Sequence, residues 1–287
     1  MPKTNTDLGE LSGPLLIFGG SYSNLQSVIA LRKEAEQRGI PPERCICTGD
    51  IVAYCGQPQE TVAAIRDWGV HCLMGNCEES FAQQADDCGC GFDEGSSCDL
   101  LSVQWYQFAN STLGSAERDW FTTLPRQIRF TLNGLRCLVI HGSVSSINQF
   151  VFASTSADIF AQQFILSDAD VIIGGHSGIP FTYRTDTYCW HNAGAIGMPA
   201  NDGSTQTWFS VLEAKPALFI QHVGLEYDHQ QAYQAMLDAQ LNNGYADALC
   251  SGLWPSMDVL PTIERQQRNQ TITPINYEWA PQLVTAD

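Results

Sequence analysis

Three short apolar runs near the start of this chain each end at a glycine, and helical patterns separate them. The runs cover residues 15–18, 45–48 and 72–74, and the helical patterns cover 24–38 and 59–68. Short strands that alternate with helices are typical of β-α-β units in a parallel sheet. Because the carboxyl ends of such strands lie at one edge of the sheet, we expect the residues that follow them to lie near one another.

The rest of the chain is richer in strand patterns than in helical ones. Periodicity fails over residues 83–98, a stretch rich in Gly, Asp and Cys that we interpret as an inserted loop. The later pattern predicts strands at 127–131, 136–140, 171–174, 181–184, 189–191, 208–212 and 218–222, and helices at 100–109, 116–124, 156–166 and 228–241, with a last helix that ends at 249. We therefore predict an α/β fold with a second sheet packed on the first.

The two ends of the chain lie outside this pattern. The polar residues 1–13 are expected to form a flexible N-terminal arm, and 14–253 the folded domain. Residues 254–287 lose periodicity and form a C-terminal extension, which covers either one edge of the domain or a partner subunit.

The charge of the chain excludes two classes of partner. Lys and Arg total 14 against 31 Asp and Glu, the net charge is −17 and the pI is about 4.5. So few cations cannot neutralise a nucleic-acid backbone or an anionic bilayer. The first 13 residues do not resemble a signal peptide, and no apolar run reaches the roughly eighteen residues of a membrane span. We expect a cytoplasmic protein that binds neither nucleic acid nor membranes.

Cysteine is unusually frequent. The chain has 11 cysteines, although a domain of this size needs no disulfides for stability, so we expect most of the thiols to be reduced. Cys45, Cys47, Cys137 and Cys189 stand among apolar residues and are expected to be small core side chains.

Four polar residues follow the ends of predicted strands, and each has a glycine beside it. They are Asp50, Asn76, His141 and His176. One carboxylate, one amide oxygen and two imidazoles suit Mn²⁺, Fe²⁺ or Zn²⁺ and leave positions open for water or substrate. A single histidine at a strand end is more commonly a structural residue. Four such residues in this arrangement predict a site derived from metal binding.

These motifs resemble, in order, those of the calcineurin-like metallophosphoesterases, in their bacterial phosphodiesterase-like branch. The resemblance lies in 47–54 (CTGDIVAY), 75–76 (GN), 141–143 (HGS), 175–180 (GHSGIP) and 192–199 (NAGAIGMP), and it extends over about 15–252. It implies a four-layer α/β/β/α fold, a two-sheet mixed β-sandwich flanked by helices, and phosphoester hydrolysis. It also implies that Asp50, Asn76 and His141 are catalytic and that these three bind metal together with His176.

The chain departs from this family at the second metal position. Members hold two ions around a bridging hydroxide, and the ligand shared by both ions corresponds to Asp50. The other ion takes an Asp-x-His motif after the first strand and a second His from a Gly-His-x-His motif, where this chain has Gly20, Tyr22 and Gly178. Glycine offers no side-chain ligand, so we expect at most one ion. Loss of the second charge predicts a rate lower by roughly a thousandfold or more.

Several accessory residues keep more than one interpretation. Tyr22 either offers its phenol to a metal or phosphate, or fills the space of the missing ion. Cys77 stands where many members have a catalytic His, although some relatives have Cys there. The loop cysteines Cys88, Cys90 and Cys98 form a thiolate metal site, a redox pair or disulfide, or a packed loop with free thiols. We favour the packed loop.

These observations lead to three functional hypotheses. The leading one is a phosphoesterase-like protein that binds a small phosphate-bearing molecule at a site with at most one metal ion, with slow or narrow hydrolysis. The second is a non-catalytic binding or scaffold protein on the same fold. The third is a thiol-based metal or redox sensor that uses the cysteine-rich loop.

Overall fold

The strands of this protein form two six-stranded mixed sheets. In the computed structural model, which describes residues 5–281, sheet A has the strand order β1-β5-β6-β7-β9-β8 and sheet B the order β12-β11-β10-β2-β3-β4. Sheet A consists of β1 (Asn5–Leu11), β5 (Gln127–Leu132), β6 (Leu135–Val139), β7 (Val171–Gly174), β8 (Phe181–Arg184) and β9 (Cys189–Asn192). Sheet B consists of β2 (Leu15–Phe18), β3 (Cys45–Cys47), β4 (His71–Cys72), β10 (Thr207–Ala214), β11 (Leu218–Leu225) and β12 (Asn276–Trp279).

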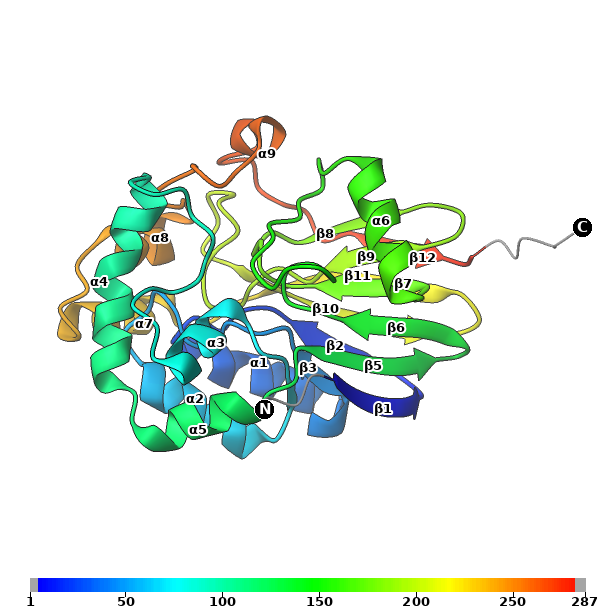
Figure 1. Ribbon diagram of the computed structural model, residues 1–287, viewed down its shortest axis with the longest axis horizontal. Coiled ribbons are helices and arrows are strands. Elements are labelled where there is room, and N and C mark those ends of the chain that lie inside the picture. The colour runs from blue at the N-terminus through cyan, green and yellow to red at the C-terminus, as the bar shows by residue number, and fades with distance from the viewer. Residues whose placement is uncertain (1–4, 282–287) are drawn as a thin grey trace, which may run out of the picture.

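Helices cover the outer faces of the two sheets (Figure 1). The helices of the described residues are α1 (Leu25–Gln37), α2 (Pro58–Trp68), α3 (Asn76–Gln83), α4 (Ser97–Thr112), α5 (Ser115–Thr123), α6 (Ala157–Ser167), α7 (His229–Asp238), α8 (Gly244–Ser251) and α9 (Thr262–Gln266), of which α9 stands apart from the sheets (Figure 1). In Figure 1, α6 lies on one side of the strands, and α1 and α2 lie on the other. Within the described residues no helix has both the length and the apolar composition needed to cross a bilayer.

Strand β2 shows how the layers are built. Its residues are all fully buried, because alternate side chains point to opposite faces and both faces are covered. Leu16 and Phe18 belong to the core between sheet B and its helices, whereas Leu15 and Ile17 belong to the core between the two sheets. On the far side of sheet A, Phe160 of α6 packs in a third core. The predicted four-layer α/β/β/α fold is confirmed.

The structure differs from the sequence-based expectation at both ends of the chain. Asn5–Leu11 lies in the segment expected to be a flexible arm, but it forms β1, which pairs in parallel with β5. Asn276–Trp279 lies in the C-terminal extension and forms β12, which pairs antiparallel with β11. Each is an edge strand of its sheet, so the fold extends beyond residues 14–253 at both ends. Residues 1–4 and 282–287 lie outside the described part of the chain.

Two histidines outside the predicted cluster are buried between the sheets. His191 of β9 and His222 of β11 are 0% and 4% exposed, and the Thr182 hydroxyl lies 3.0 Å from a ring nitrogen of each. Burial lowers the pKa of His191 well below its usual value, and the neighbouring His222 lowers it further. Burial also lowers the pKa of His222 to about 4. Both rings are therefore neutral at pH 7.

This histidine pair predicts a loss of stability in acid. Between pH 6.5 and pH 4 the unfolded state takes up a proton at His222 while the folded state does not, so the free energy of unfolding falls as the pH falls. We expect His222 to contribute a loss of about 3 kcal/mol across this window. Urea denaturation at pH 7 and pH 4.5 measures it. His222→Gln should reduce the difference between the two pH values, and an unchanged difference contradicts the prediction.

Candidate functional site

The four polar residues predicted to bind metal lie together in the structure. Asp50 follows β3, Asn76 begins α3, His141 follows β6 and His176 follows β7, so both sheets contribute. Their side chains are at most 8% exposed. One ligand atom from each of Asp50, His141 and His176 lies within 4.8 Å of the other two. The carboxyl ends of strands from two sheets therefore meet at one buried cluster.

The backbone at Asp50 is adapted to this position. Asp50 has a φ of 55° and Gly49 a φ of 98°, in the left-handed region that non-glycine residues rarely adopt. A Cβ atom on Gly49 would lie 2.7 Å from the amide nitrogen of Gly75 and 2.8 Å from the His141 ring. Glycine at 49 is therefore required for the close approach of these segments.

His141 presents an unprotonated nitrogen to the cluster when its ring is neutral. Its Nδ1 lies 2.6 Å from the carbonyl oxygen of Thr48, which can only accept a hydrogen bond, so Nδ1 carries the proton. Its Nε2 lies 3.2 Å from Asp50 Oδ2 and 3.0 Å from Asn76 Oδ1. Burial lowers the pKa of His141, but the charge and hydrogen bond of Asp50 outweigh burial and raise it overall.

His176 and Asn76 are oriented in the same way. The Nε2 of His176 lies 3.2 Å from the carbonyl oxygen of Cys90, so Nε2 donates and Nδ1 faces His141 Nε2 at 3.1 Å. The Asn76 amide nitrogen donates to the carbonyl oxygen of Cys88 at 2.9 Å, which turns the amide oxygen toward His141. Burial and the proximity of His141 lower the pKa of His176 to about 3.

This arrangement fits a cation. Asp50 Oδ2, Asn76 Oδ1, His141 Nε2 and His176 Nδ1 all face one another with lone pairs when the rings are neutral. Such atoms repel one another unless a positive charge lies between them, either a metal ion or a proton on one imidazole. The nitrogen atoms of Asn76 and of both imidazoles that point away from the cluster donate hydrogen bonds to backbone carbonyls. Such hydrogen bonds fix the orientation of metal ligands in proteins.

Glu78 supports the segment that carries Asp50. It is fully buried, and its carboxylate accepts hydrogen bonds from the backbone N–H groups of Asp50, Ile51, Val52 and Gly75 at 2.8 to 3.2 Å. Burial and the charge of Asp50 raise the pKa of Glu78 to about 7, although its backbone hydrogen bonds lower it. Asp50 itself has a pKa below its usual range, because His141 and His176 outweigh the effect of burial.

Tyr22 fills the space beside the cluster. A Cβ atom on Gly20 would overlap the Tyr22 ring, and one on Gly178 would lie 3.4 Å from the Tyr22 hydroxyl. The ring is 6% exposed, and Tyr22 adopts a φ of 48°. The phenol therefore lies between Gly20 and Gly178, the two glycines that replace ligands of the family's second ion. These residues do not fit a second ion held by an Asp and two His side chains.

The other accessory residues take different places. The backbone N–H of Cys77 donates to Asp50 Oδ1 at 3.2 Å, and its sulfur lies 3.5 Å from the Asn76 amide nitrogen. Cys98 is a buried free thiol in α4 that lines a pocket beside His176. The expected core positions of Cys45, Cys47, Cys137 and Cys189 are confirmed, because all four are buried and free.

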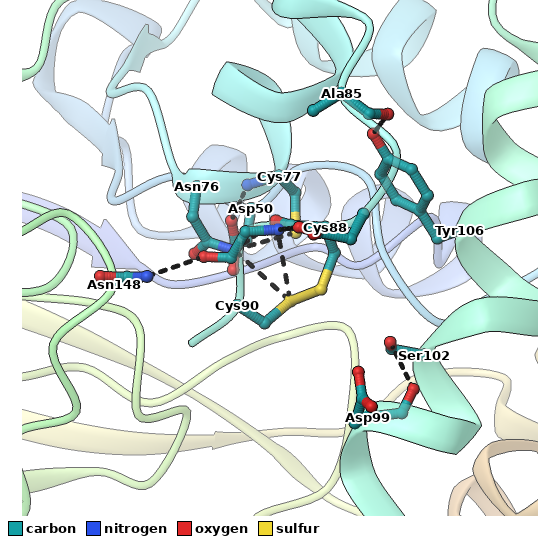
Figure 2. Close-up of a disulfide and its surroundings, with 12 residues drawn as sticks. Asp50, Asn76, Cys77, Ala85, Cys88, Cys90, Asp99, Ser102, Tyr106 and Asn148 are labelled. Carbon is teal, nitrogen blue, oxygen red and sulfur yellow. Dashed lines mark hydrogen bonds between the residues drawn. A yellow bond between two sulfur atoms is a disulfide. The ribbon is translucent and has the colours of Figure 1, made fainter. Parts of the chain in front are cut away.

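A disulfide joins Cys88 and Cys90 next to the cluster (Figure 2). The preferred interpretation of this loop, packed with free thiols, is therefore wrong. Cys88 and Cys90 contribute their carbonyl oxygens to the site, one to Asn76 and one to His176. Gly89 between them has a φ of 63°, and its carbonyl accepts a hydrogen bond from Asn148 at 3.0 Å. The disulfide thus closes a small loop that orients two of the four candidate ligands.

The disulfide is expected to matter more for local geometry than for global stability. It closes a ring of very few residues, so the loop-entropy contribution is only about 1.5 kcal/mol. We expect the double variant Cys88→Ser, Cys90→Ser to fold and to lose about that much free energy of unfolding in urea. Cys250→Ser removes an exposed free thiol and serves as the control. Failure of the double variant to fold contradicts this expectation.

Comparisons with known proteins agree with the fold. A family model described as a calcineurin-like phosphoesterase superfamily domain matches residues 23–215. The structure of a metallophosphoesterase from Sphaerobacter thermophilus has a TM-score of 0.67 at 20% identity and covers 85% of this chain and 100% of that one. The structure of a hypothetical protein from Pyrococcus horikoshii has a TM-score of 0.70 at 16% identity. The match covers 83% of this chain and 98% of that one. An uncharacterised protein of Methanocaldococcus jannaschii is 23% identical over 255 residues, 83% of this chain and 98% of that protein.

Proposed function

Because this chain belongs to the calcineurin-like phosphoesterase superfamily, we propose that it binds one divalent ion, Mn²⁺, Fe²⁺ or Zn²⁺, at Asp50, Asn76, His141 and His176. At this ion it binds a small phosphate-bearing molecule and hydrolyses the ester slowly. The observation that carries the proposal is the inward orientation of four lone-pair atoms. The carbonyls of Thr48, Cys88 and Cys90 fix that orientation for Asn76 and the two histidines.

Each residue of the cluster has a separate task in this proposal. Asp50 provides the negative charge, and Glu78 holds the backbone of Asp50 in its left-handed conformation. His141 and His176 offer neutral imidazole nitrogens, and Asn76 offers an amide oxygen. A bound ion would supply a Lewis acid that lowers the pKa of a water molecule and polarises a phosphate oxygen.

A non-catalytic binding or scaffold protein is the second candidate, and one observation favours it. The Tyr22 ring lies between Gly20 and Gly178, so the space where the family holds its other ion contains a phenol. Without that ion, the negative charge that develops during phosphoryl transfer is stabilised from one side only.

Metal analysis and turnover separate the two candidates. Elemental analysis of the purified protein should give about one first-row ion per chain, and His176→Ala should lose it. Absence of bound ion after incubation with Mn²⁺, Fe²⁺ or Zn²⁺ contradicts the metal site. Hydrolysis of phosphodiesters and phosphomonoesters with added Mn²⁺ should be slow but above background. If the ion is bound but every substrate is hydrolysed only at the background rate, the protein is a non-catalytic binding or scaffold protein.

A further inference from the structure

An aromatic pocket opens beside the proposed metal site. It has a volume of ≈ 60 Å³, and His176 belongs to both the pocket wall and the cluster. Its aromatic lining includes Tyr22, Tyr54, Phe150, Tyr245 and Trp254. A water molecule needs on the order of 10 to 15 Å³ by this measure, so the pocket has room for a few waters or for one edge of a flat ring.

The wall of the pocket contains two groups of aromatic rings in contact. In one group, Tyr54 contacts the Tyr22 ring edge to face at 4.8 Å and stacks on the Tyr245 ring at 4.5 Å between centroids. In the other group, the centroid of the Phe150 ring lies 4.1 Å from that of the His176 ring. Flat apolar faces of this kind favour a ring that is stacked or packed edge to face against them.

The pocket offers hydrogen-bond donors but no charge. None of the described residues that line it is Lys, Arg, Asp or Glu. Burial raises the pKa of Tyr54 and Tyr245 above the usual value, so both phenols stay neutral. A neutral phenol can donate a hydrogen bond to an acceptor on an otherwise apolar ligand. A charged or highly hydroxylated group would lose its hydration here without matching partners.

We propose that this pocket binds a planar, uncharged aromatic group, and that the ligand of the neighbouring site is an aromatic phosphoester. The inference rests on the proposed function, because it places the phosphate at the four-residue cluster. His176 connects the two parts: its Nδ1 faces the cluster, and its ring packs against Phe150 in a tilted arrangement at the pocket wall. The ester bond would then lie at the boundary between the polar cluster and the aromatic wall.

Calorimetric titration of the Mn²⁺-loaded protein tests this inference with three probes: inorganic phosphate, methyl phosphate and phenyl phosphate. Burial of a ring in place of a methyl group removes several additional carbons from water, so we expect phenyl phosphate to bind at least about tenfold more tightly than methyl phosphate. Inorganic phosphate reports on the metal site alone.

Variants of the wall provide the structural test. Tyr245→Leu should reduce the preference for phenyl over methyl phosphate several-fold and leave the affinity for inorganic phosphate unchanged. Phe150→Leu tests the opposite wall at a half-buried position, where the fold tolerates the change better. Tyr233→Leu, in α7 and outside the pocket lining, is the control and should keep the full preference.

The possible results distinguish the inference from the proposed function. Equal affinities for the phenyl and methyl esters, with inorganic phosphate bound, overturn the aromatic pocket and leave the metal site standing. A preference for phenyl phosphate that survives both wall variants also overturns it. If none of the three probes binds to the Mn²⁺-loaded protein, the proposed function fails, and the inference fails with it.

Discussion

Asp50→Asn is expected to remove the stabilisation that metal gives this protein. Asparagine keeps the oxygen that accepts the hydrogen bond from the Cys77 N–H, but it lacks the only negative charge among the four proposed ligands. We expect metal affinity to fall by about a hundredfold or more. At a metal concentration of 100 times the wild-type Kd, the wild type should gain about 2.7 kcal/mol and the variant no more than about 0.4 kcal/mol. Melting curves with and without Mn²⁺ or Zn²⁺ measure this difference.

A buried histidine outside the cluster provides the control for this experiment. His191→Gln changes a fully buried imidazole in β9, so it tests whether any buried polar substitution blocks the metal response. This variant should keep the full metal-induced shift, even if its own melting temperature is lower. If Asp50→Asn shows the same metal-induced shift in melting temperature as the wild type, Asp50 is not a metal ligand.

Glu78→Ala should be among the most destabilising single substitutions in the chain. The side chain is fully buried and accepts hydrogen bonds from four backbone N–H groups in two segments. Alanine leaves these groups unpaired in the interior, where each unsatisfied donor costs about 1 to 3 kcal/mol before relaxation. We expect the free energy of unfolding to fall by about 3 to 5 kcal/mol in urea denaturation at pH 8.

The adjacent residue offers a matched control. Glu79 lies on the same helix and pairs with Arg126, but both side chains of this ion pair are partly exposed. Partly exposed ion pairs contribute little, so Glu79→Ala should cost no more than about 1 kcal/mol. Equal losses in the two variants would show that the hydrogen bonds of Glu78 have no special importance.

The sequence predicts the inner layers of this fold well, because their signals are local. The apolar run of β2 and the helical pattern of α1 lie next to each other in the chain, and both are found within a residue or two of the expected ends. Strand β1 was missed because its sequence, NTDLGEL, is polar and its partner β5 begins at Gln127, more than a hundred residues away. Strand β12 was missed because its alternation of polar and aromatic residues, NYEW, extends over only four residues.

Some residues of the candidate site could likewise be predicted from the sequence, and others could not. Asp50, Asn76, His141 and His176 could be found from the sequence because each follows a strand and adjoins a glycine. The role of Glu78 could not, since three of its four hydrogen-bond donors lie 26 to 28 residues earlier in the chain. An acid at the start of a helix has an ordinary explanation in the helix dipole.

The cysteine-rich loop shows a further limit of sequence analysis. The spacing of Cys88 and Cys90 allows a metal site, a disulfide or free thiols, and no neighbouring residue selects among them. The structure joins the two sulfurs and directs the carbonyl oxygens of both residues toward Asn76 and His176. These backbone groups have no signature in the sequence, because every residue carries a carbonyl.

Strand β1 is an edge strand of sheet A and β12 is an edge strand of sheet B. This has a consequence for any shortened form of the chain. Removal of residues 5–11 would leave the hydrogen-bonding groups along one edge of β5 without a partner, and removal of residues 276–279 would do the same to one edge of β11. Unpaired strand edges of this kind recruit further strands from neighbouring molecules. A protein that lacks either edge strand is therefore expected to self-associate at micromolar concentration, and light scattering of the two truncated forms would reveal it.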